Sequence, residues 1–559
     1  MLTMTGAELT VQLLERQGVD IIAGIPGASN LPFYDVLARR KKIRHVLARH
    51  EQGAGFMAQG MARVSGRPGV CVTTSGPGVT NILTALADAK LDSVPLICIT
   101  GQVPRAMMGT DAFQEVDTYG LSIPITKHNF LVRSAEELLT IIPRAFTLAM
   151  SGRTGPVLID IPRDVQDEMV TFTEWPAPGM AEITPLPARH SLERCAQLIN
   201  KAKRPVICLG GGAARSGAEQ AARNLAEKAA MPAAMTLMGL GLMPADHPLS
   251  LGMLGMHGAR YTNMVLEECD LFLAVGIRFD DRATGKVTEF CPNATIVHVD
   301  IDPCELDKIK TSAMSIGGDA KTVLESLVEL VEPVSRSEWL DRVNILRRDF
   351  AYAFDRIDDP LSSYGLVART GQMLDDETLI TTDVGQHQMR TAQAYPFAYS
   401  RQWLTSGGLG TMGFGLPAAI GAALAAPEVR VVCFSGDGSI LMNIQEMATA
   451  VEENVNVKIV LADNRCLGLV HQIQDMFFHK RHYATEYRVQ VDFLAVARGF
   501  GMAAVDLGIA DDPAAALKQA LDGPGPCLIR VPVSALDHVF PMVPSGAANT
   551  EMIGGKSHV

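Results

Sequence analysis

The sequence predicts an α/β protein with three doubly wound, parallel-sheet domains, and three observations lead to this prediction. Short, continuously apolar runs alternate with helical patterns, which is typical of strands buried on both faces of a parallel sheet. Two segments with little hydrophobic periodicity divide the chain, and a weak internal repeat relates its first and last thirds. At 559 residues, the chain is also too long for a single hydrophobic core.

The apolar runs are the expected strands. They begin at Asp20, Gly69, Pro95, Pro156, Leu271, Thr295, Val429 and Val457. None alternates between apolar and polar residues, so we expect parallel sheets covered by helices. The most apolar long stretch runs from Met412 to Pro427, is interrupted by Pro417 and is short for a membrane span, so we expect a buried helix there.

Two segments mark the expected domain boundaries. Residues 173–190 carry Pro176, Pro178, Pro185 and Pro187 and resemble a linker, whereas residues 333–362 are charged and partly helical. We therefore predict a first domain at 1–175, a middle domain at 190–335, a third domain at 360–535 and a C-terminal arm at 536–559.

The internal repeat has a fixed offset of 360 residues. Gly53, Gly55, Ala58, Ala62, Val72, Ser75, Gly76 and Gly78 match Gly413, Gly415, Ala418, Ala422, Val432, Ser435, Gly436 and Gly438. In both copies a helix rich in Gly and Ala leads into a buried strand that ends in Ser-Gly-x-Gly. Chance could produce such a match, but identities in register favour two related domains that flank a different middle one.

Composition excludes several classes of protein. A net charge of −12 argues against a general nucleic-acid binder. The ten cysteines form no Cys-x-x-Cys pair, which disfavours zinc, iron–sulfur and disulfide-scaffold proteins. The first residues lack the basic flank and apolar core of a signal peptide, so we expect reduced cysteines and a cytoplasmic protein without a membrane anchor.

The motif with the clearest chemistry is Ser435-Gly-Asp-Gly-Ser, followed at a distance by Asp463-Asn464. It ends a buried strand, where open α/β sheets bind ligands, and its glycines allow a phosphate to approach the backbone. Asp437 and Asn464 end neighbouring strands, so their oxygens can converge on one hard cation. An ordinary strand-to-helix turn explains Gly-Asp-Gly alone about equally well.

Together these residues resemble the thiamine-diphosphate motif, which usually ends Asn-Asn and here ends Asp463-Asn464. The resemblance implies that Asp437, Asn464 and the carbonyl of Cys466 bind magnesium. Arg49-His-Glu51 resembles the segment that supplies the cofactor-activating glutamate, a carboxyl that assists deprotonation of the thiazolium. Gly407-Gly-Leu-Gly-Thr-Met412 resembles the segment that holds the pyrimidine, with Met412 wedged beneath the cofactor and Gly410 accepting from its amino group.

Further segments narrow the resemblance to the large catalytic subunits of acetohydroxyacid (acetolactate) synthases, closest to the isozyme I type. They begin at Arg49, Gly109, Leu251, Arg278, Thr382, Leu467 and Pro541 and span nearly the whole chain. The family implies decarboxylation of pyruvate and transfer of the hydroxyethyl unit to pyruvate or 2-oxobutyrate, the first common step of branched-chain amino-acid biosynthesis. It also implies thiamine diphosphate, Mg²⁺, a non-redox FAD, a homodimer or dimer of dimers, and a small regulatory subunit, with no nucleic-acid or membrane partner.

The resemblance also implies the site residues. Thiamine diphosphate is expected to contact Glu51, Val384, Gly385, Gln386, His387, Gly410, Met412, Gly436, Asp437, Gly438, Ser439, Asn464, Cys466 and Leu467. FAD is expected to contact Arg153, Gly210, Gly211, Gly212, Thr236, Leu237, Gly255, Met256, His257, Gly276, Arg278, Asp280, Arg282, Asp300, Ile301, Asp319 and Ala320. Substrates are expected to contact Phe113, Gln114 and Arg282, with Leu469, Val470 and Ile473 affecting the choice of acceptor. Taken alone, the glycine turn at 210–212 and the acidic strand end at 300 are weak signals of a nucleotide site.

Three departures bear on specificity rather than on chemistry. Arg163 replaces the usual lysine, Ile473 replaces a tryptophan that selects 2-oxobutyrate, and Leu469 replaces a nearby methionine. A smaller apolar side chain at Ile473 predicts a weak preference for 2-oxobutyrate.

The alternatives are other enzymes and a binding protein. A pyruvate decarboxylase often has a paired His-His, which is absent here, and a pyruvate oxidase would use FAD for turnover. Glyoxylate carboligase lacks the glutamate that Glu51 supplies, and a nicotinamide dehydrogenase needs a glycine fingerprint that Ile22-Ala-Gly-Ile-Pro-Gly does not give. A non-catalytic protein on the same fold predicts damage at Glu51, Asp437 or Asn464, and all three are intact.

Overall fold

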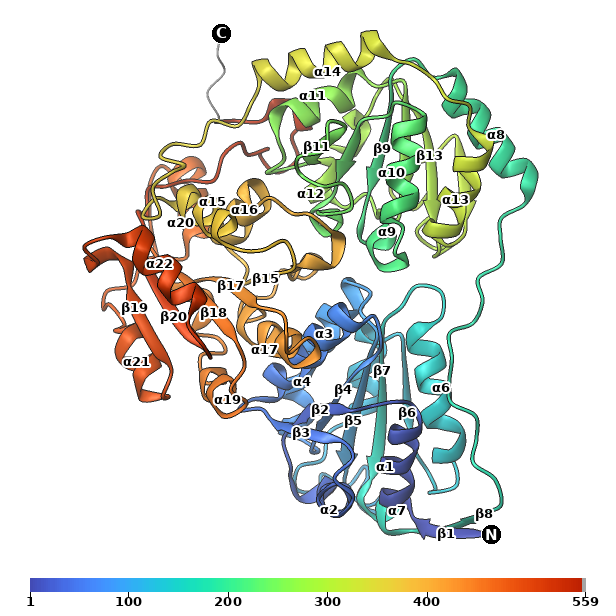
Figure 1. Cartoon of the computed structure of the whole chain (residues 1–559). Coiled ribbons are helices and arrows are strands. Elements are labelled where there is room, and N and C mark those ends of the chain that lie inside the picture. The colour runs from blue at the N-terminus through green and yellow to red at the C-terminus, as the bar shows by residue number, and fades with distance from the viewer. Residues whose placement is uncertain (555–559) are drawn as a thin grey trace.

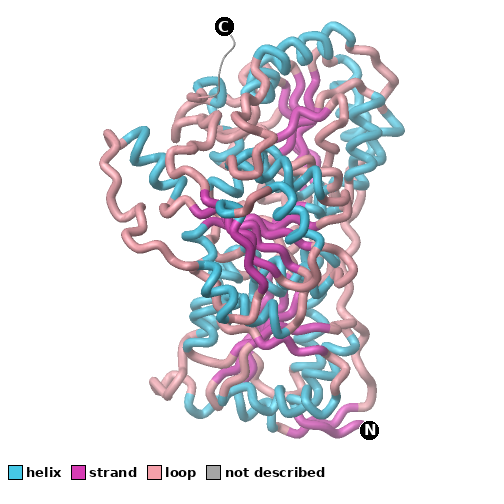
Figure 2. Tube along the Cα trace, turned by 60° about the vertical axis from the view of Figure 1, so that its left-hand side comes forward, coloured by secondary structure: helices cyan, strands magenta, loops and turns pink. Residues whose placement is uncertain are grey.

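Three six-stranded sheets form the framework of the computed structural model, which describes residues 1–554. All neighbouring strands within these sheets run parallel, and helices cover them, so the predicted α/β class is confirmed. The strands lie in groups along the long direction of the molecule (Figure 2). In Figure 1 the first unit is blue, the middle unit green and the third unit orange to red, and a long linker joins the first unit to the middle one.

The first unit contains a sheet in the order β3-β2-β4-β5-β7-β6. Its strands are β2 (Ile21–Gly24), β3 (Arg44–Leu47), β4 (Gly69–Thr73), β5 (Leu96–Gln102), β6 (His128–Leu131) and β7 (Pro156–Pro162). Its helices are α1 (Gly6–Arg16), α2 (Leu31–Arg40), α3 (Glu51–Ser65), α4 (Pro77–Leu91), α5 (Thr118–Ser122), α6 (Leu138–Met150) and α7 (Arg163–Asp167). A separate antiparallel pair, β1 (Leu2–Thr5) and β8 (Met169–Phe172), closes the unit.

The third unit repeats this topology. Its sheet order is β16-β15-β17-β18-β20-β19, which matches the first sheet strand for strand, so the repeat does mark related folds. The strands are β15 (Leu379–Thr382), β16 (Trp403–Leu404), β17 (Val431–Gly436), β18 (Val457–Asp463), β19 (Ala503–Asp506) and β20 (Cys527–Pro532). The helices are α15 (Ser363–Met373), α16 (Gln386–Ala394), α17 (Gly415–Ala425), α18 (Asp437–Ile440), α19 (Glu446–Glu452), α20 (Gly468–Phe477), α21 (Phe493–Gly499) and α22 (Pro513–Asp522).

The middle unit has a different sheet, in the order β11-β10-β9-β12-β13-β14. Its strands are β9 (Pro205–Leu209), β10 (Ala233–Met235), β11 (Ser250–Met253), β12 (Leu271–Val275), β13 (Thr295–Asp300) and β14 (Met314–Gly317). Its helices are α8 (Arg189–Lys201), α9 (Gly211–Ser216), α10 (Glu219–Lys228), α11 (Arg260–Glu268), α12 (Asp281–Thr284), α13 (Ala320–Leu330) and α14 (Ser337–Asp349). The order reverses direction between β9 and β12, and dinucleotides bind at such switch points.

Helices α3 and α17, the two copies of the repeat helix, pack against each other between the first and third units (Figure 1). Small residues make this approach close. A Cβ added to Gly421 would lie 1.9 Å from the carbonyl oxygen of Met57, and one on Gly60 would lie 2.1 Å from that of Ala418. Helix α17 is buried over nearly its whole length, as predicted for the apolar stretch.

The chain beyond β20 returns to the middle unit. The amide of Val543 donates to the carbonyl of Met256, and the Arg260 guanidinium donates to the carbonyl of Met552. The last residues of the predicted arm, 555–559, lie outside the described part. Within residues 1–554, no helix is both long and apolar enough to cross a membrane.

The close helix crossing predicts a large effect of one methyl group. Gly421→Ala should lower the free energy of unfolding by about 1–3 kcal/mol or more, because the helices must separate to admit the Cβ. Gly499→Ala, in α21 with open space around its Cβ, is the matched control and should be neutral or stabilise by up to ~1 kcal/mol. Urea unfolding midpoints compare the two, and equal shifts would contradict a tight crossing.

Candidate active site

A cavity of about 200 Å³ lies at the carboxyl ends of β15, β17 and β18. It gathers, within one chain, every residue predicted for thiamine diphosphate except Glu51. These are Val384, Gly385, Gln386, His387, Gly410, Met412, Gly436, Asp437, Gly438, Ser439, Asn464, Cys466 and Leu467. Gly436 packs closely against His387 in the cavity wall, since a Cβ on Gly436 would lie 2.8 Å from the His387 ring.

Asp437 has the environment of a cation ligand. Its Oδ1 accepts from the amide of Gly438, whereas Oδ2 is buried with no hydrogen-bond partner among the described residues. Burial, and then the nearby carboxylate of Asp463, raises the pKa of Asp437 well above its ordinary value. Asn464 also belongs to the cavity lining, and its Oδ1 accepts from the amide of Cys466. An orphaned, buried carboxylate oxygen near an amide oxygen fits a hard divalent ion.

Asp463, the departure from the usual Asn-Asn ending, has a partner of its own. The guanidinium of Arg530 on β20 lies 2.8 Å from the Asp463 carboxylate and also pairs with Asp506 at 2.7 Å. This arginine offsets the charge that aspartate adds beside the cavity. The departure therefore leaves the predicted ligand Asn464 in place.

Asp383 joins the two glycine motifs of the third unit. Its buried carboxylate accepts from the amides of Gly413 and Gly415 at 2.7 and 3.0 Å, and from the hydroxyl of Ser435 at 2.7 Å. The residues directly after Met412 and the Ser435-Gly-Asp-Gly turn are thereby fixed to each other. Gly410 and Met412 line the cavity together with Asp437 as a result.

Glu51 is not among the residues that line this cavity; it is the first residue of α3. Its side chain is buried and accepts a hydrogen bond of 2.9 Å from the amide group of Asn81. Of the predicted substrate residues, Gln114 lies near the start of α4: a Cβ on Gly76 would lie 2.8 Å from the Cα of Gln114, and one on Gly78 would lie 3.5 Å from the Glu51 carboxylate. Phe113 is 87% exposed. Within one chain, this group does not line the cavity that holds Asp437.

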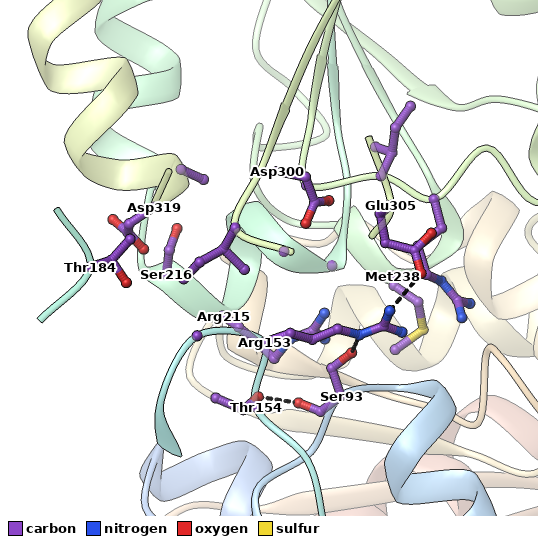
Figure 3. A pocket seen from close by; sticks show the side chains of 18 of the residues that line it. Ser93, Arg153, Thr154, Thr184, Arg215, Ser216, Met238, Asp300, Glu305 and Asp319 are labelled. Carbon is purple, nitrogen blue, oxygen red and sulfur yellow. Dashed lines mark hydrogen bonds and ion pairs between the residues drawn. The ribbon is translucent and has the colours of Figure 1, made fainter. Parts of the chain in front are cut away.

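The middle unit has a cavity of about 410 Å³ at the switch point of its sheet (Figure 3). The glycine turns after β9 and β12 line it and touch closely, because a Cβ on Gly212 would lie 2.7 Å from the Cα of Gly276. Arg153 lies across it, bound to Glu305 at 2.6 Å. The predicted FAD residues that line it are Arg153, Gly211, Gly212, Thr236, Gly276, Arg278, Asp280, Asp300, Ile301, Asp319 and Ala320.

A larger cavity of about 710 Å³ adjoins it and shares Thr236, Met238, Arg278 and Asp280 with it. Its lining includes the remaining predicted contacts Leu237, Met256, His257 and Arg282, and the acceptor residues Leu469 and Ile473. Val470 lines the smaller cofactor cavity instead, whereas Gly210 and Gly255 are not among the residues that line these three cavities. Arg282 is exposed and lies 3.6 Å from the Asp281 carboxylate, with which it forms a surface ion pair.

Sequence reasoning missed several lining residues. Arg215 lines the middle-unit cavity, and its side chain is exposed. Its position soon after the glycine turn at 210–212 was the available signal. Phe477 and Phe478 line the larger cavity with Ile473, and Phe477 follows Ile473 by one helical turn, which the sequence does show.

A histidine cluster on and after α20 was also not predicted. His471 and His482 both lie near the Glu486 carboxylate, at 3.2 and 3.6 Å. Their rings stack with centroids 3.9 Å apart and planes within 21°, so their lone pairs lie in nearly parallel planes. The ligand atoms of the three side chains are close enough to hold one ion, but a tetrahedral ion needs lone pairs that converge, which stacked rings do not favour.

Glu446 on α19 connects the third unit to the residues just before Glu51. Its fully buried carboxyl accepts from the amides of Arg49 and His50, each at 3.0 Å, and from the hydroxyl of Thr449 at 2.7 Å. Burial raises the pKa of Glu446 to about 7. The same carboxyl occupies the space beside Gly53, where a Cβ would lie 2.4 Å from its oxygen.

Comparison with known proteins gives a consistent result. Models of the thiamine pyrophosphate enzymes match at residues 4–121 (N-terminal TPP binding domain), 192–327 (central domain) and 383–531 (C-terminal TPP binding domain). The chain is 57% identical over 550 residues to the acetolactate synthase isozyme 1 large subunit of Escherichia coli (strain K12), covering 98% of each. It is 44% identical to the isozyme 2 large subunit of that organism, covering 98% of this chain and 99% of the relative. It is also 44% identical to the chloroplastic acetolactate synthase 1 of Oryza sativa subsp. japonica, covering 98% and 87%.

The raised pKa of Glu446 predicts a pH-dependent contribution to stability. The folded protein holds this proton up to about pH 7, whereas the unfolded chain releases it near the ordinary value, so stability from Glu446 falls as pH rises between about 4.5 and 7. Glu446→Gln keeps a hydrogen-bond acceptor and does not titrate. Relative to wild type, its free energy of unfolding should therefore increase by up to ~3 kcal/mol as pH rises across that range, measured by urea unfolding at several pH values. Glu452→Gln, an exposed change on the same helix, is the control, and parallel pH profiles for Glu446→Gln and wild type would refute the assignment.

Proposed function

The chain belongs to the family of acetolactate synthase large subunits, and from this premise we propose that it joins two 2-oxo acids with loss of carbon dioxide. Two pyruvates would give 2-acetolactate, and pyruvate with 2-oxobutyrate would give 2-aceto-2-hydroxybutyrate, the first common step of branched-chain amino-acid biosynthesis. The observation that carries the proposal is the third-unit cavity, which collects the cofactor residues around the orphaned oxygen of Asp437.

The third unit would hold thiamine diphosphate through magnesium. Asp437, Asn464 and the carbonyl of Cys466 are the proposed ligands, and Gly436, Gly438 and Ser439 surround the diphosphate position. The bound cofactor supplies a thiazolium carbon that adds to pyruvate and accepts the electrons released with carbon dioxide. Met412 and Gly410 would support and orient the pyrimidine ring, and Asp383 holds the amide of Gly413 directly after Met412.

Glu51 is the proposed proton carrier. Its carboxyl is buried and held by Asn81, which suits a group that exchanges a hydrogen bond with a pyrimidine nitrogen. Because Glu51 and the cofactor cavity are apart in one chain, we propose a homodimer, or a dimer of dimers, in which Glu51 of one subunit serves the cavity of the other. Phe113 and Gln114 would reach the reacting carbon from the same side as Glu51.

We propose that FAD binds in the two middle cavities and has a structural rather than a redox role, as the family resemblance implies. The reversed strand order and the touching glycine turns fit a dinucleotide, and Arg153, Asp300 and Asp319 offer polar contacts along the smaller cavity. Arg282, in the larger cavity, would receive the carboxylate of the second substrate with its planar, permanently charged group.

The proposal also covers the binding partners and the cellular location of the chain. The bacterial relatives are named large subunits, so we propose that a smaller regulatory subunit binds this chain. All ten cysteines are free, and only Cys304 is exposed, which supports a cytoplasmic protein. The net charge supports the absence of nucleic-acid partners.

The activity and the role of Glu51 can be tested together by measuring 2-acetolactate formed from pyruvate. Wild type should require both thiamine diphosphate and Mg²⁺, and Glu51→Gln should lower turnover by ~10²–10⁴-fold, since it removes general acid–base assistance. Glu136→Gln, an exposed change in the same unit, is the control. Turnover of Glu51→Gln within a few-fold of wild type would refute the role, and oxygen or quinone reduction without carboligation would favour the oxidase alternative.

Ile473 predicts how the acceptor is chosen. It lines the larger cavity and is 40% exposed, so a tryptophan would fit and would restore an apolar contact to the extra methylene of 2-oxobutyrate. One methylene in such a pocket is worth ~1–3 kcal/mol, so Ile473→Trp should raise the ratio of acetohydroxybutyrate to acetolactate roughly tenfold in a competition with equal acceptors.

The wild type should form acetolactate readily in that competition. Ile345→Trp, on α14 and similarly exposed at 38%, is the matched control and should leave the ratio unchanged. A strong bias toward acetohydroxybutyrate in wild type that Ile473→Trp does not alter would rule the proposal out.

A further inference from the structure

The segment from Ser406 to Thr411 carries Gly410, precedes Met412 and is held largely from outside its own unit. It borders both the cofactor cavity and the larger middle cavity. The amides of Gly407 and Gly408 donate to the Asp92 carboxylate at 3.1 and 2.7 Å, and the amide of Thr411 donates to the hydroxyl of Ser406 at 2.8 Å. Its backbone conformation therefore depends on a side chain in the first unit.

Two buried aspartates at the end of the first unit's helix α4 provide this support. The hydroxyls of Ser406 and Thr411 both donate to Oδ1 of Asp88, the latter at 3.0 Å, and Asp92 binds the two glycine amides. Both carboxylates are buried, and Oδ2 of Asp88 has no hydrogen-bond partner among the described residues. Asp88 and Asp92 thus hold both ends of the segment.

Burying the Asp88 and Asp92 carboxylates costs desolvation free energy. Arg63 is close to both aspartates, at 2.7 Å from Asp92 and 3.8 Å from Asp88. Burial, and then the charge of Asp92, raises the pKa of Asp88. Arg215 also interacts electrostatically with Asp92. Burying two carboxylates still costs desolvation free energy that an apolar contact between the units would not. This cost is understandable when the carboxylates position a functional loop.

The end of helix α4, at Asp92 and Ser93, is also in contact with residues that line the proposed flavin cavity. Arg215, which lines that cavity, donates to the carbonyl of Asp92 at 2.8 Å, and Arg153 donates to the hydroxyl of Ser93 at 2.9 Å. Figure 3 shows Arg215, Arg153 and Ser93 together at the cavity wall. A third lining residue, Arg278, lies 3.2 Å from where a Cβ of Gly408 would be. Residues that would bind flavin therefore touch both Asp92 and the glycine segment.

We propose that Asp88 and Asp92 are positioning residues that hold the Ser406–Thr411 segment against the thiamine cofactor, and that the contact of Arg215 with Asp92 links flavin binding to that segment. This inference rests on the proposed function. By linkage, FAD should tighten thiamine diphosphate binding, and thiamine diphosphate should tighten FAD binding by the same factor.

The test is the dissociation constant of thiamine diphosphate, with Mg²⁺, measured with and without saturating FAD on the full chain. Wild type should bind about 5- to 150-fold more tightly with FAD, the range typical of coupled sites. Asp92→Asn presents an amide group to one of the glycine amides, so it should reduce this ratio to within about twofold of one. The circular-dichroism band of the bound aminopyrimidine should change with it.

Two further variants separate positioning from general support between units. Asp88→Asn keeps the Oδ1 acceptor and should retain the wild-type ratio, whereas Asp88→Ala should lose it. Arg44→Gln removes another ion pair between the first and third units, with Glu453, and should keep the ratio. An equal loss in Arg44→Gln would overturn the positioning role.

The outcomes distinguish this inference from the proposed function. Wild type that fails to bind thiamine diphosphate at all would refute the function, whereas wild type that binds it equally with and without FAD would refute only the linkage. If Asp92→Asn does not fold, Arg215→Gln tests the link from the flavin side and should also reduce the ratio to about one. An unchanged ratio in folded Asp92→Asn or Arg215→Gln would overturn the inference.

Discussion

The close crossing of α3 and α17 is the constraint on which the arrangement of the sites depends. Gly60 and Gly421 let each helix approach the backbone of the other, and no larger residue fits without separating them. The crossing fixes the first sheet relative to the third. It thereby brings Asp88 and Asp92 to the Ser406–Thr411 segment and Glu446 to the residues before Glu51.

The two related sheets serve different purposes although their strand orders agree. In the third unit, the strand ends carry the glycine turn and Asp437, and they enclose a cavity. In the first unit, α3 precedes the equivalent strand, β4, and presents Glu51 beside Asn81. Within one chain, Glu51 is not among the residues that line the cavity of Asp437.

Buried carboxylates occur at several places around the proposed site. Asp437 has an oxygen without a described partner and lies near Asp463, whose charge Arg530 offsets. Asp88 and Asp92 share Arg63, and Glu446 is surrounded by backbone amides. Each arrangement costs desolvation energy, and each holds or contacts a segment of the proposed site. The apolar strands at the centre of each sheet supply the stability that offsets this cost.

The sequence by itself determined the fold class, the buried strands and the groups that share one cavity in the third unit. Continuous apolar runs identify strands locally, and parallel strands bring their carboxyl ends to one edge, so strand order along the chain was enough to predict that Asp437 and Asn464 lie together. Only the tertiary structure decided that α3 packs on α17 and that Arg215 and Asp92 meet. These contacts join residues that are far apart in the sequence, and they depend on shape and hydrogen-bond geometry between units, which hydrophobic periodicity along one segment does not encode.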